Sequence, residues 1–456
     1  MGVVGSLPEE VDVVVIGGGA GGYTAAIRAS ELGKSVALVE ADKLGGSCLN
    51  YTCIPTATLI NIANKFQYAK GNKDLGITGT PQIDFKKAHE YRMNVSKKLS
   101  SGVESLCKLH GIEVFNAMGS FLSSNSLQLS DGVTLNFKKA IISTGTKLAQ
   151  PEKFKIDGVK VLDHKSTLSL DYIPKSIVIV NDDYAAIEFS SMFAKLGSKV
   201  YVISEKGIFS RLDQDLVAIP KKKLADLGVE VYEKDPVKSY SDGKITLESG
   251  KEITADIIAL SPERVPYTEG LGLENTKVQL NEKGFIKVDS HLQTTDPNIY
   301  ASGDIVGQPM SATKALRQGV IAGESASGLN SEFDNVAIPE TILSDPEIAI
   351  VGKLSGDGIK TVKFPFSASG RAIADDATEG FVKIAYDENG VVKGVGIVGE
   401  NADVAIGEAT LGIEMSAMLE DIADTIHPHP TMSEGLEEAA EGALGRPIDF
   451  YIAPSH

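Results

Sequence analysis

The sequence predicts an α/β protein with two Rossmann-like β-α-β domains, followed by a C-terminal α+β domain. Residues 11–40 and 175–204 each read as an apolar strand, a turn, a helix and a second apolar strand. The two segments align without a gap at an offset of 164 residues, so they form an internal repeat. Residues 381–399 alternate between apolar and polar positions, which predicts the strands of the α+β domain.

The composition is that of a soluble enzyme with several domains. The chain has 456 residues, too many for one ordinary core, and a net charge of -17 at pH 7. This charge argues against nucleic acid, which binds basic surfaces. No apolar run approaches the ~20 residues that span a bilayer, and residues 1–10 lack a secretory signal. We therefore expect a cytoplasmic protein that binds no membrane. Met1, Gly2 and Ser6 match a myristoylation pattern, for which a short N-terminal tail is the simpler interpretation.

The first repeat carries a complete dinucleotide-binding fingerprint. Gly17, Gly19 and Gly22 have G-x-G-x-x-G spacing between the first strand and the helix. These residues allow a tight turn, the approach of the backbone to a pyrophosphate, and close packing of the helix on the strand. Glu40 ends the second strand, where its carboxylate can accept hydrogen bonds from a ribose.

The second repeat keeps the pattern of strands and helix but has lost this fingerprint. Asn181, Asp183 and Ala186 stand at the three glycine positions, and Ser204 stands where the first copy has Glu40. Alanine is tolerated at the third position, but a carboxylate at the second points toward the pyrophosphate and repels it. Asp182 adds negative charge to the turn. We therefore expect the second domain to keep its fold and to bind no nucleotide.

Two of the three cysteines are close together and follow the first repeat. Cys48 and Cys53 would fall on roughly one face of a helix, within reach of a disulfide. No further Cys/His pair has zinc spacing, so we expect redox chemistry and no metal. Cys107 lies in a predicted helix and is interpreted as a buried small residue.

A histidine-rich segment near the C-terminus supplies a candidate base. Residues 427–434 read HPHPTMSE. Thiol–disulfide exchange needs a base because the thiolate is the nucleophile. Histidine titrates near neutrality and suits this role, and a nearby carboxylate can fix its tautomer.

Together, the fingerprint, the cysteine segment GGSCLNYTCIPTATLI at 45–60 and the histidine segment resemble the class I pyridine nucleotide-disulfide oxidoreductases, most closely the dihydrolipoamide dehydrogenases. The resemblance covers nearly the whole chain and implies FAD as cofactor. It implies that Cys48 exchanges with substrate and that Cys53 faces the flavin as the charge-transfer thiol. His429 would be the base and Glu434 its partner. In the family this histidine reaches the disulfide of the other subunit, so a homodimer is implied.

Further flavin contacts are implied at segments that resemble other landmarks of the family, IISTGT at 141–146, IYASGDIVG at 299–307 and GQPMSATKA at 307–315. The cofactor-binding residues expected beside the fingerprint are Gly46, Ser47, Gly119, Thr144, Gly145, Asp304 and Ala312.

The departures from the family cluster around the nicotinamide. Besides the altered turn, Glu263 replaces the glycine that the family usually has before an arginine, and Ala57 replaces a lysine near the flavin. Glu188, the usual partner of that lysine, is present and needs another partner. Tyr184 stands where some relatives cover the flavin with a tyrosine, although simple packing would also explain it. NAD is therefore a doubtful partner, and another electron acceptor is expected.

Four regions are predicted: an FAD-binding domain with the redox disulfide at 1–148, a degenerate NAD-binding-like domain at 149–266, a central domain completing the FAD site at 267–337, and a dimerisation domain at 338–456. Three functions remain open. The first is a dihydrolipoyl dehydrogenase-like enzyme, acting on dihydrolipoamide or a lipoyl-bearing protein, with a weakened or lost NAD site. The second is a disulfide reductase for another thiol, and the third is a non-catalytic FAD-containing subunit.

Overall fold

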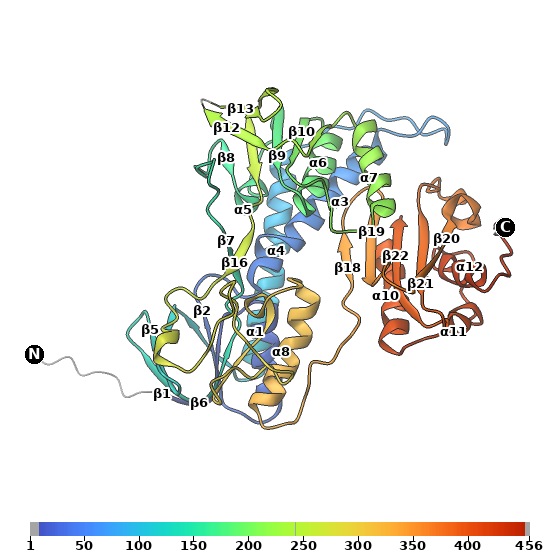
Figure 1. Ribbon diagram of the computed structural model, residues 1–456. Helices are drawn as coiled ribbons and strands as arrows, with labels where there is room; N and C mark the ends of the chain where they lie inside the picture. The colour runs from blue at the N-terminus through green and yellow to red at the C-terminus, as the bar shows by residue number, and fades with distance from the viewer. Residues whose placement is uncertain (1–8, 242, 452–456) are drawn as a thin grey trace, which may run out of the picture. The chain divides into compact units, whose positions relative to one another are not determined.

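The computed structural model describes residues 9–241 and 243–451 (Figure 1). The chain divides into two compact units. Unit 1 contains residues 1–58, 86–151 and 262–334, and unit 2 contains residues 59–85, 152–261 and 335–456. The myristoylation pattern of Met1, Gly2 and Ser6 lies outside the described residues.

Unit 1 is built on a seven-stranded sheet with the order β3-β2-β1-β6-β5-β4, in which β17 also pairs with β6. The sheet is parallel along the path β3-β2-β1-β6-β17. It is antiparallel at the edge formed by β5, which pairs with β6, and β4, which pairs with β5. The strands are β1 (Glu9–Ile16), β2 (Val36–Glu40), β3 (Glu113–Asn116), β4 (Gly119–Ser123), β5 (Ser126–Leu129), β6 (Thr134–Ile142) and β17 (Ile299–Ala301).

Helices cover this sheet and carry the cysteines. α1 (Ala20–Glu31) joins β1 to β2 and packs against α8 (Ala312–Ala326) through small residues, since a Cβ at Gly319 would lie 2.4 Å from the Gly21 carbonyl oxygen. Two short elements, β7 (Thr146–Leu148) and β16 (Arg264–Pro266), pair antiparallel, and a 3-10 turn, η2 (Gly303–Val306), follows β17. The remaining helices are α2 (Gly46–Asn50), α3 (Cys53–Ala69), which continues into unit 2, and α4 (Phe85–Leu109).

Unit 2 contains the second repeat, and its sheet confirms the predicted duplication. The parallel sheet has the order β11-β10-β9-β15-β8. Val13 pairs with Val36 in the first unit, and Ile177 pairs with Val200 in the second, so the register repeats at the sequence offset of 164. The elements are β8 (Val161–Leu162), α5 (His164–Thr167), β9 (Ser176–Val180), α6 (Tyr184–Leu196), β10 (Lys199–Ser204), α7 (Gln214–Asp226), β11 (Glu230–Glu233) and β15 (Ile257–Leu260), with a small sheet of β12 (Val237–Ser241), β13 (Lys244–Leu247) and β14 (Glu252–Thr254).

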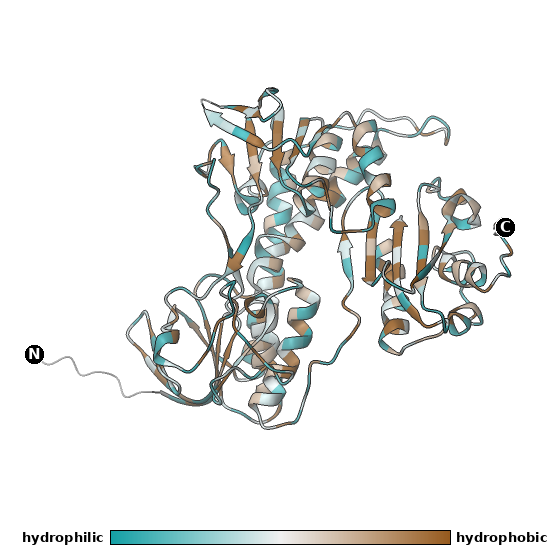
Figure 2. Cartoon of the chain, in the orientation of Figure 1, coloured by the Kyte–Doolittle hydropathy of each residue, from teal (hydrophilic) through white to brown (hydrophobic). Residues whose placement is uncertain are grey.

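The C-terminal part of unit 2 is an antiparallel sheet with helices packed on it, as the alternating pattern predicts. The strand order is β18-β19-β22-β21-β20, and the three central strands β19, β22 and β21 are coloured mainly as hydrophobic in Figure 2. Their side chains form a core with α10, α11 and α12. The elements are β18 (Glu340–Ile342), β19 (Glu347–Gly352), β20 (Lys360–Pro365), α9 (Gly370–Ala374), β21 (Phe381–Tyr386), β22 (Val392–Gly399), α10 (Ala402–Glu414), α11 (Leu419–Ala423) and α12 (Glu434–Ala443).

The two units cut across the four predicted regions. Unit 1 takes most of 1–148 together with 262–334, and unit 2 joins most of 149–266 to 335–456. The four boundaries remain predictions. None of the helices in the described residues combines the length and the apolar character that a bilayer span requires.

Candidate active site

The turn after β1 has the geometry that close approach of a pyrophosphate requires. Gly17 has a φ of +99°, a left-handed conformation that favours glycine. A Cβ at Gly22 would lie 1.7 Å from the Gly17 carbonyl oxygen, so only glycine allows α1 to pack this closely on the turn. The N-cap of α1 is Gly19, which brings no side chain to the first amides of the helix. A helix N-terminus of this kind binds phosphate groups.

The carboxylate of Glu40 is fixed beside this turn. Its Oε2 accepts a hydrogen bond from the Gly18 amide at 2.6 Å, and its Oε1 accepts one from the Asp42 amide at 2.7 Å. An acidic side chain held at the end of the second strand can accept hydrogen bonds from a ribose. The chain therefore fits the pyrophosphate and ribose of a dinucleotide such as FAD.

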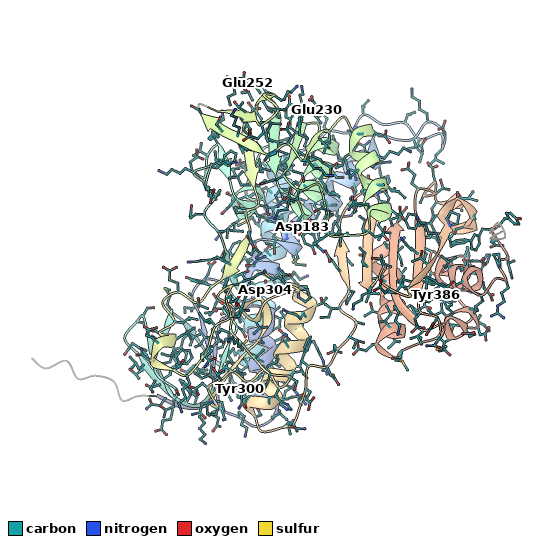
Figure 3. The ribbon with its side chains drawn as sticks, in the orientation of Figure 1. Asp183, Glu230, Glu252, Tyr300, Asp304 and Tyr386 are labelled. Atoms are coloured by element: carbon teal, nitrogen blue, oxygen red, sulfur yellow. The ribbon has the colours of Figure 1, made fainter. Side chains whose placement is uncertain are left out.

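The other residues expected to contact FAD all lie in unit 1. Thr144 donates from its hydroxyl to the Tyr267 carbonyl at 2.8 Å, and Asp304 on η2 lies 3.9 Å from the guanidinium of Arg264 (Figure 3). Lys314 on α8 is buried and donates to the Gly307 carbonyl, and burial lowers its pKa to about 8. Of the remaining positions, Gly46 and Ser47 lie in α2, Gly119 begins β4, Gly145 follows β6 with a φ of +67°, and Ala312 begins α8.

The two cysteines do not share one helix, and the prediction of a common helical face is wrong. Cys48 lies in α2 and Cys53 begins α3. The helix is interrupted between them. The Tyr51 and Thr52 amides both donate to the Ser47 carbonyl, and this pair of hydrogen bonds ends α2. Both cysteines are free thiols in this structure, Cys48 half-buried and Cys53 exposed. Cys107 is buried in α4, as expected.

The surroundings divide the charge unequally between the two thiols. A hydrogen bond from Cys48 lowers the pKa of Cys53 to about 6. Desolvation of the sulfur by nearby protein atoms opposes this shift, although the residue as a whole is exposed, and Thr52 and Arg264 lower the pKa further. The pKa of Cys48 is raised by the same hydrogen bond, by burial and by the nearby charges of Cys53 and Asp304. These surroundings therefore favour the thiolate on Cys53.

The turn of the second repeat is held by hydrogen bonds of the Asn181 side chain. This residue stands at the position of Gly17, but its φ is not positive. Its side-chain oxygen accepts hydrogen bonds from the amides of Asp183 at 2.7 Å and Ala186 at 3.3 Å, and its Nδ2 donates to the Ser261 carbonyl at 2.9 Å. The Asn181 side-chain oxygen therefore occupies backbone N–H groups at the start of α6. In a nucleotide-binding domain, the pyrophosphate would bind at this helix N-terminus.

Asp182 supplies the carboxylate that Ser204 lacks. Its Oδ1 accepts hydrogen bonds from the Ser204 hydroxyl at 2.7 Å and from the Lys206 amide at 3.1 Å. Lys206 corresponds to Asp42 of the first repeat, whose amide binds Glu40. In the second repeat the carboxylate therefore comes from the turn and not from the end of the strand. Asp182 was expected to add negative charge to the turn, and its hydrogen bonds to Ser204 and Lys206 are an additional role.

Asp183 is held by an arginine, and its carboxylate does not stand alone. Arg211 binds Glu340 of β18 through both terminal nitrogens, at 2.8 and 2.5 Å, and contacts Asp183 at 3.1 Å (Figure 3). Tyr184 donates its hydroxyl to Glu340 at 2.7 Å. Burial raises the pKa of Asp183, whereas hydrogen bonds from Arg211 and Tyr184 hold the pKa of Glu340 below its usual value although burial opposes them. The guanidinium is therefore paired with two carboxylates of the chain.

The other departures lie in different surroundings. Glu188 is buried, and its carboxylate accepts a hydrogen bond from the Leu343 amide at 3.1 Å, which supplies the alternative partner it was expected to need. Ala57 lies one turn after Cys53 on α3. Glu263 belongs to unit 1 and is exposed, while Asp182 and Asp183 belong to unit 2.

The predicted base and its partner are in direct contact. The Nδ1 atom of His429 lies 2.6 Å from Oε1 of Glu434, and the other carboxylate oxygen accepts a hydrogen bond from the Thr431 amide at 2.6 Å. The imidazole is largely exposed, with 79% of its surface accessible. A carboxylate on Nδ1 leaves Nε2 free to exchange a proton with a thiol.

Sequence reasoning missed Arg211, Glu340, Arg264 and His427. Arg211 and Glu340 are separated by 129 residues, so no local pattern relates them. Arg264 directly follows Glu263, and His427 lies in the histidine segment at 427–434, two residues before His429. A role was predicted for these neighbours but none for Arg264 or His427. The signal that was available for Arg211 was the charge of Asp183, since a half-buried carboxylate needs a cation.

Comparisons with known proteins agree with this geometry. Residues 11–319 match the family model described as pyridine nucleotide-disulphide oxidoreductase, and residues 338–440 match its dimerisation domain. The chain is 40% identical to the dihydrolipoyl dehydrogenase of Geobacillus stearothermophilus, covering 98% of this chain and 99% of that protein. It is 36% identical to the dihydrolipoyl dehydrogenase of Haloferax volcanii with the same coverage.

Solved structures share the fold. The structure of LpdA from Mycobacterium tuberculosis superposes with a TM-score of 0.88 over 95% of this chain and 100% of that one, at 24% identity, which shows the fold alone. The HOCl-induced flavoprotein disulfide reductase RclA from Escherichia coli superposes with a TM-score of 0.84 over 94% of this chain and 99% of that one, at 26% identity.

Proposed function

This chain belongs to the pyridine nucleotide-disulphide oxidoreductase family of FAD-binding enzymes, and we propose that it oxidises a dihydrolipoyl group without passing the electrons to NAD. The enzyme is an FAD-dependent disulfide oxidoreductase with dihydrolipoyl dehydrogenases among its relatives. The proposal has two parts, a thiol half-reaction that the chain retains and a nucleotide site that the chain has closed.

The thiol half-reaction follows from the unequal charge of the two cysteines. A thiolate of the substrate attacks Cys48 in the Cys48–Cys53 disulfide, and Cys53 leaves as the thiolate that its surroundings favour. The second thiolate of the substrate attacks the mixed disulfide and releases Cys48 and a cyclic disulfide product. The enzyme is then a dithiol. The turn between β1 and α1 and the carboxylate of Glu40 would hold FAD, and the flavin beside Cys53 would supply an acceptor for the electron pair of this dithiol.

His429 acts as the general base of this exchange in the proposed reaction. Its Nε2 removes a proton from the attacking thiol, and Glu434 on Nδ1 stabilises the imidazolium that results. In the family that this chain resembles, the histidine reaches the disulfide of the other subunit, so the proposed enzyme is a homodimer. The match of residues 338–440 to the dimerisation domain supports this arrangement.

One observation carries the second part of the proposal: the side chain of Asn181 caps α6 at the place where a pyrophosphate would bind. Its oxygen lies 2.7 Å from the Asp183 nitrogen. A nucleotide would have to displace this hydrogen bond and meet the carboxylate of Asp183, whose counterion Arg211 is already paired with Glu340. Both costs oppose binding. The electrons therefore leave the flavin for an acceptor other than NAD.

Equilibrium titration with NADH tests this part. The substitution pair Asn181→Gly and Asp183→Gly rebuilds a G-x-G-x-x-A turn and should tighten NADH binding at least about tenfold, equivalent to about 1.4 kcal/mol. The matched control is Asp183→Asn, which removes the charge and leaves Asn181 on the amides, and it should gain much less. Tight NADH binding by the unmodified enzyme would contradict the proposal.

A disulfide reductase for another thiol is the second candidate, because the flavoprotein disulfide reductase RclA shares the fold at 26% identity. Turnover of the same enzyme with an artificial electron-accepting dye, with dihydrolipoamide or low-molecular-weight thiols as the electron donor, separates the two candidates. The same dye is the electron acceptor in each turnover measurement with dihydrolipoamide. The third candidate, a non-catalytic FAD subunit, predicts that Cys48→Ser has no effect on the biological role of the protein.

A further inference from the structure

His427 is the inward anchor of the loop that carries His429. Of residues 424–430, only His427 is buried, with 2% of its side chain accessible, while its neighbours Ile426 and Pro428 are exposed. The loop runs from the end of α11 to the start of α12. The position of His429 therefore depends on a contact made two residues earlier in the chain.

The contacts of His427 join this loop to two helices. Its Nε2 lies 2.7 Å from Oε1 of Glu408 on α10. Its Nδ1 lies 2.8 Å from the Thr425 carbonyl oxygen and 3.2 Å from Oε2 of Glu437 on α12. Among the described residues, Glu408 and Glu437 are the charged groups in contact with this ring.

We propose that His427 is a positioning residue, which fixes the loop bearing His429 to α10 and α12. This inference rests on the proposed role of His429 as the base. His427 itself touches no reacting atom and acts through the geometry of its neighbour. Misplacement of a catalytic group by about 1 Å can cost about 100-fold in rate, so a lost anchor has a large effect.

The geometry also fixes the charge of His427. Carbonyl and carboxylate oxygens accept hydrogen bonds, so these contacts are complete when both ring nitrogens donate, and they favour the imidazolium form of the ring. The hydrogen bond to Glu408 raises the pKa of His427, burial opposes it, and Glu437 adds to the rise. Because the folded-state pKa is raised, the anchor is complete at low pH and weakens as the pH rises through this raised value. The loop should therefore loosen on the alkaline side.

Hydrogen exchange of the FAD-containing enzyme tests the anchor without relying on the chemistry of His429. The reporter is the Thr431 amide, which binds Glu434 in the ordered loop. His427→Gln should accelerate its exchange at least about tenfold at all pH values. Glu408→Gln keeps an oxygen acceptor but removes the charge, so the alkaline loosening should move to lower pH. Glu438→Gln is the matched control, because it lies on α12 and binds the Asp449 amide instead.

Turnover with dihydrolipoamide provides the second readout. His427→Gln should lower it about 10- to 100-fold with FAD still bound, and Glu408→Gln should shift its alkaline decline to lower pH. Unchanged exchange at Thr431 in folded His427→Gln, or an alkaline transition that stays in place in Glu408→Gln, would overturn the proposal. If exchange accelerates but His429→Gln retains full turnover, the anchor is real and the proposed role of His429 is wrong.

Discussion

Cys48 and Cys53 differ in charge because they differ in their neighbours. The Cys53 sulfur receives hydrogen bonds from Cys48 and Thr52 and lies near the positive charge of Arg264, whereas Cys48 faces the charge of Asp304. A thiol that leaves readily as a thiolate is the one whose sulfur is not attacked by substrate. Individual side chains therefore assign Cys48 to exchange and Cys53 to the flavin side in the proposed reaction.

The titration of Cys53 is the first prediction at this scale. Its lowered pKa means that the thiolate persists as the pH falls and is lost only below about 6, compared with about 8.5 for an ordinary cysteine. Alkylation of the dithiol enzyme, followed by mass spectrometry of each cysteine, measures this value. Cys107 is the internal control, since burial raises its pKa and it should not react. A midpoint near the ordinary value would contradict the assignment.

Glu434→Gln is predicted to lower dihydrolipoamide turnover about 100-fold, within the range for loss of general acid–base assistance. The amide cannot stabilise an imidazolium as a carboxylate does, and it loses one acceptor oxygen for His429 or Thr431. Steady-state turnover measures this effect. Glu438→Gln, on the same helix, should stay within about twofold of the unmodified enzyme, as is usual for surface positions. Equal losses in both variants would point to damage of α12.

The sequence predicts functional residues whose partners lie close to them along the chain. The Cys48–Cys53 pair and the contact between His429 and Glu434 follow from short segments. The pairing of Arg211 with Asp183 and Glu340 could not be predicted, because these side chains come from three separate segments that meet only in the folded unit. The same reason hid the two glutamates that bind His427.

The two turns show how one element can be kept while its chemistry changes. Both copies join a strand to a helix with the same sheet register. The first turn needs Gly17 and Gly22 and leaves the start of α1 open to a phosphate, whereas the second places the Asn181 side chain on the start of α6 and accommodates a buried Ala186. The strands and helix follow from hydrophobic periodicity, so the changed residues of the turn left them intact.

Gly22→Ala tests the first turn. The added Cβ would lie 1.7 Å from the Gly17 carbonyl oxygen, so α1 must move away from the strand. We expect loss of bound FAD and a free energy of unfolding lowered by about 1–3 kcal/mol. The measurements are flavin content after purification and urea unfolding. Gly102→Ala is the control: this helical glycine of α4 has no atom within 4 Å of the new Cβ, and it should gain about 0.5–1 kcal/mol. Retention of FAD by Gly22→Ala would contradict the account of the turn.

Sequence patterns predicted the β-α-β repeat and the C-terminal strands but not the break between the two cysteines. A five-residue spacing is compatible with one helix, and only the hydrogen bonds of the Tyr51 and Thr52 amides to Ser47 show where α2 ends. Competition between such local hydrogen bonds is not visible in hydrophobic periodicity.

At the scale of the whole molecule, the C-terminal domain exposes an apolar stripe on α10. Val404 and Leu411 are 72% and 61% accessible, and Met415 at the end of the helix is 74% accessible. These positions are seven and four residues apart, so they share one face. In a domain that matches the dimerisation model of the family, such a stripe supports the proposed homodimer.

Leu411→Lys is predicted to weaken self-association by placing a charge in this stripe. Sedimentation at several protein concentrations should show a monomer at concentrations where the unmodified enzyme is a dimer. Because the proposed base acts on the disulfide of the other subunit, the monomer should keep FAD and lose dihydrolipoamide turnover. Glu420→Gln on α11 is the control and should change neither self-association nor turnover. Glu414→Gln is not used as a control because Glu414 accepts hydrogen bonds from the amides of Val336 and Ala337. A fully active monomer would contradict the shared site.

The central claim is that electrons enter through the thiols and cannot leave to NAD. The measurement that tests it most directly is the anaerobic absorbance spectrum of the enzyme after addition of dihydrolipoamide, recorded again after addition of NAD⁺. The account predicts a thiolate–flavin charge-transfer band that persists after NAD⁺ is added, with no NADH formed. Rapid loss of the band with formation of NADH would contradict it and would show that the turn of the second repeat still admits the nucleotide.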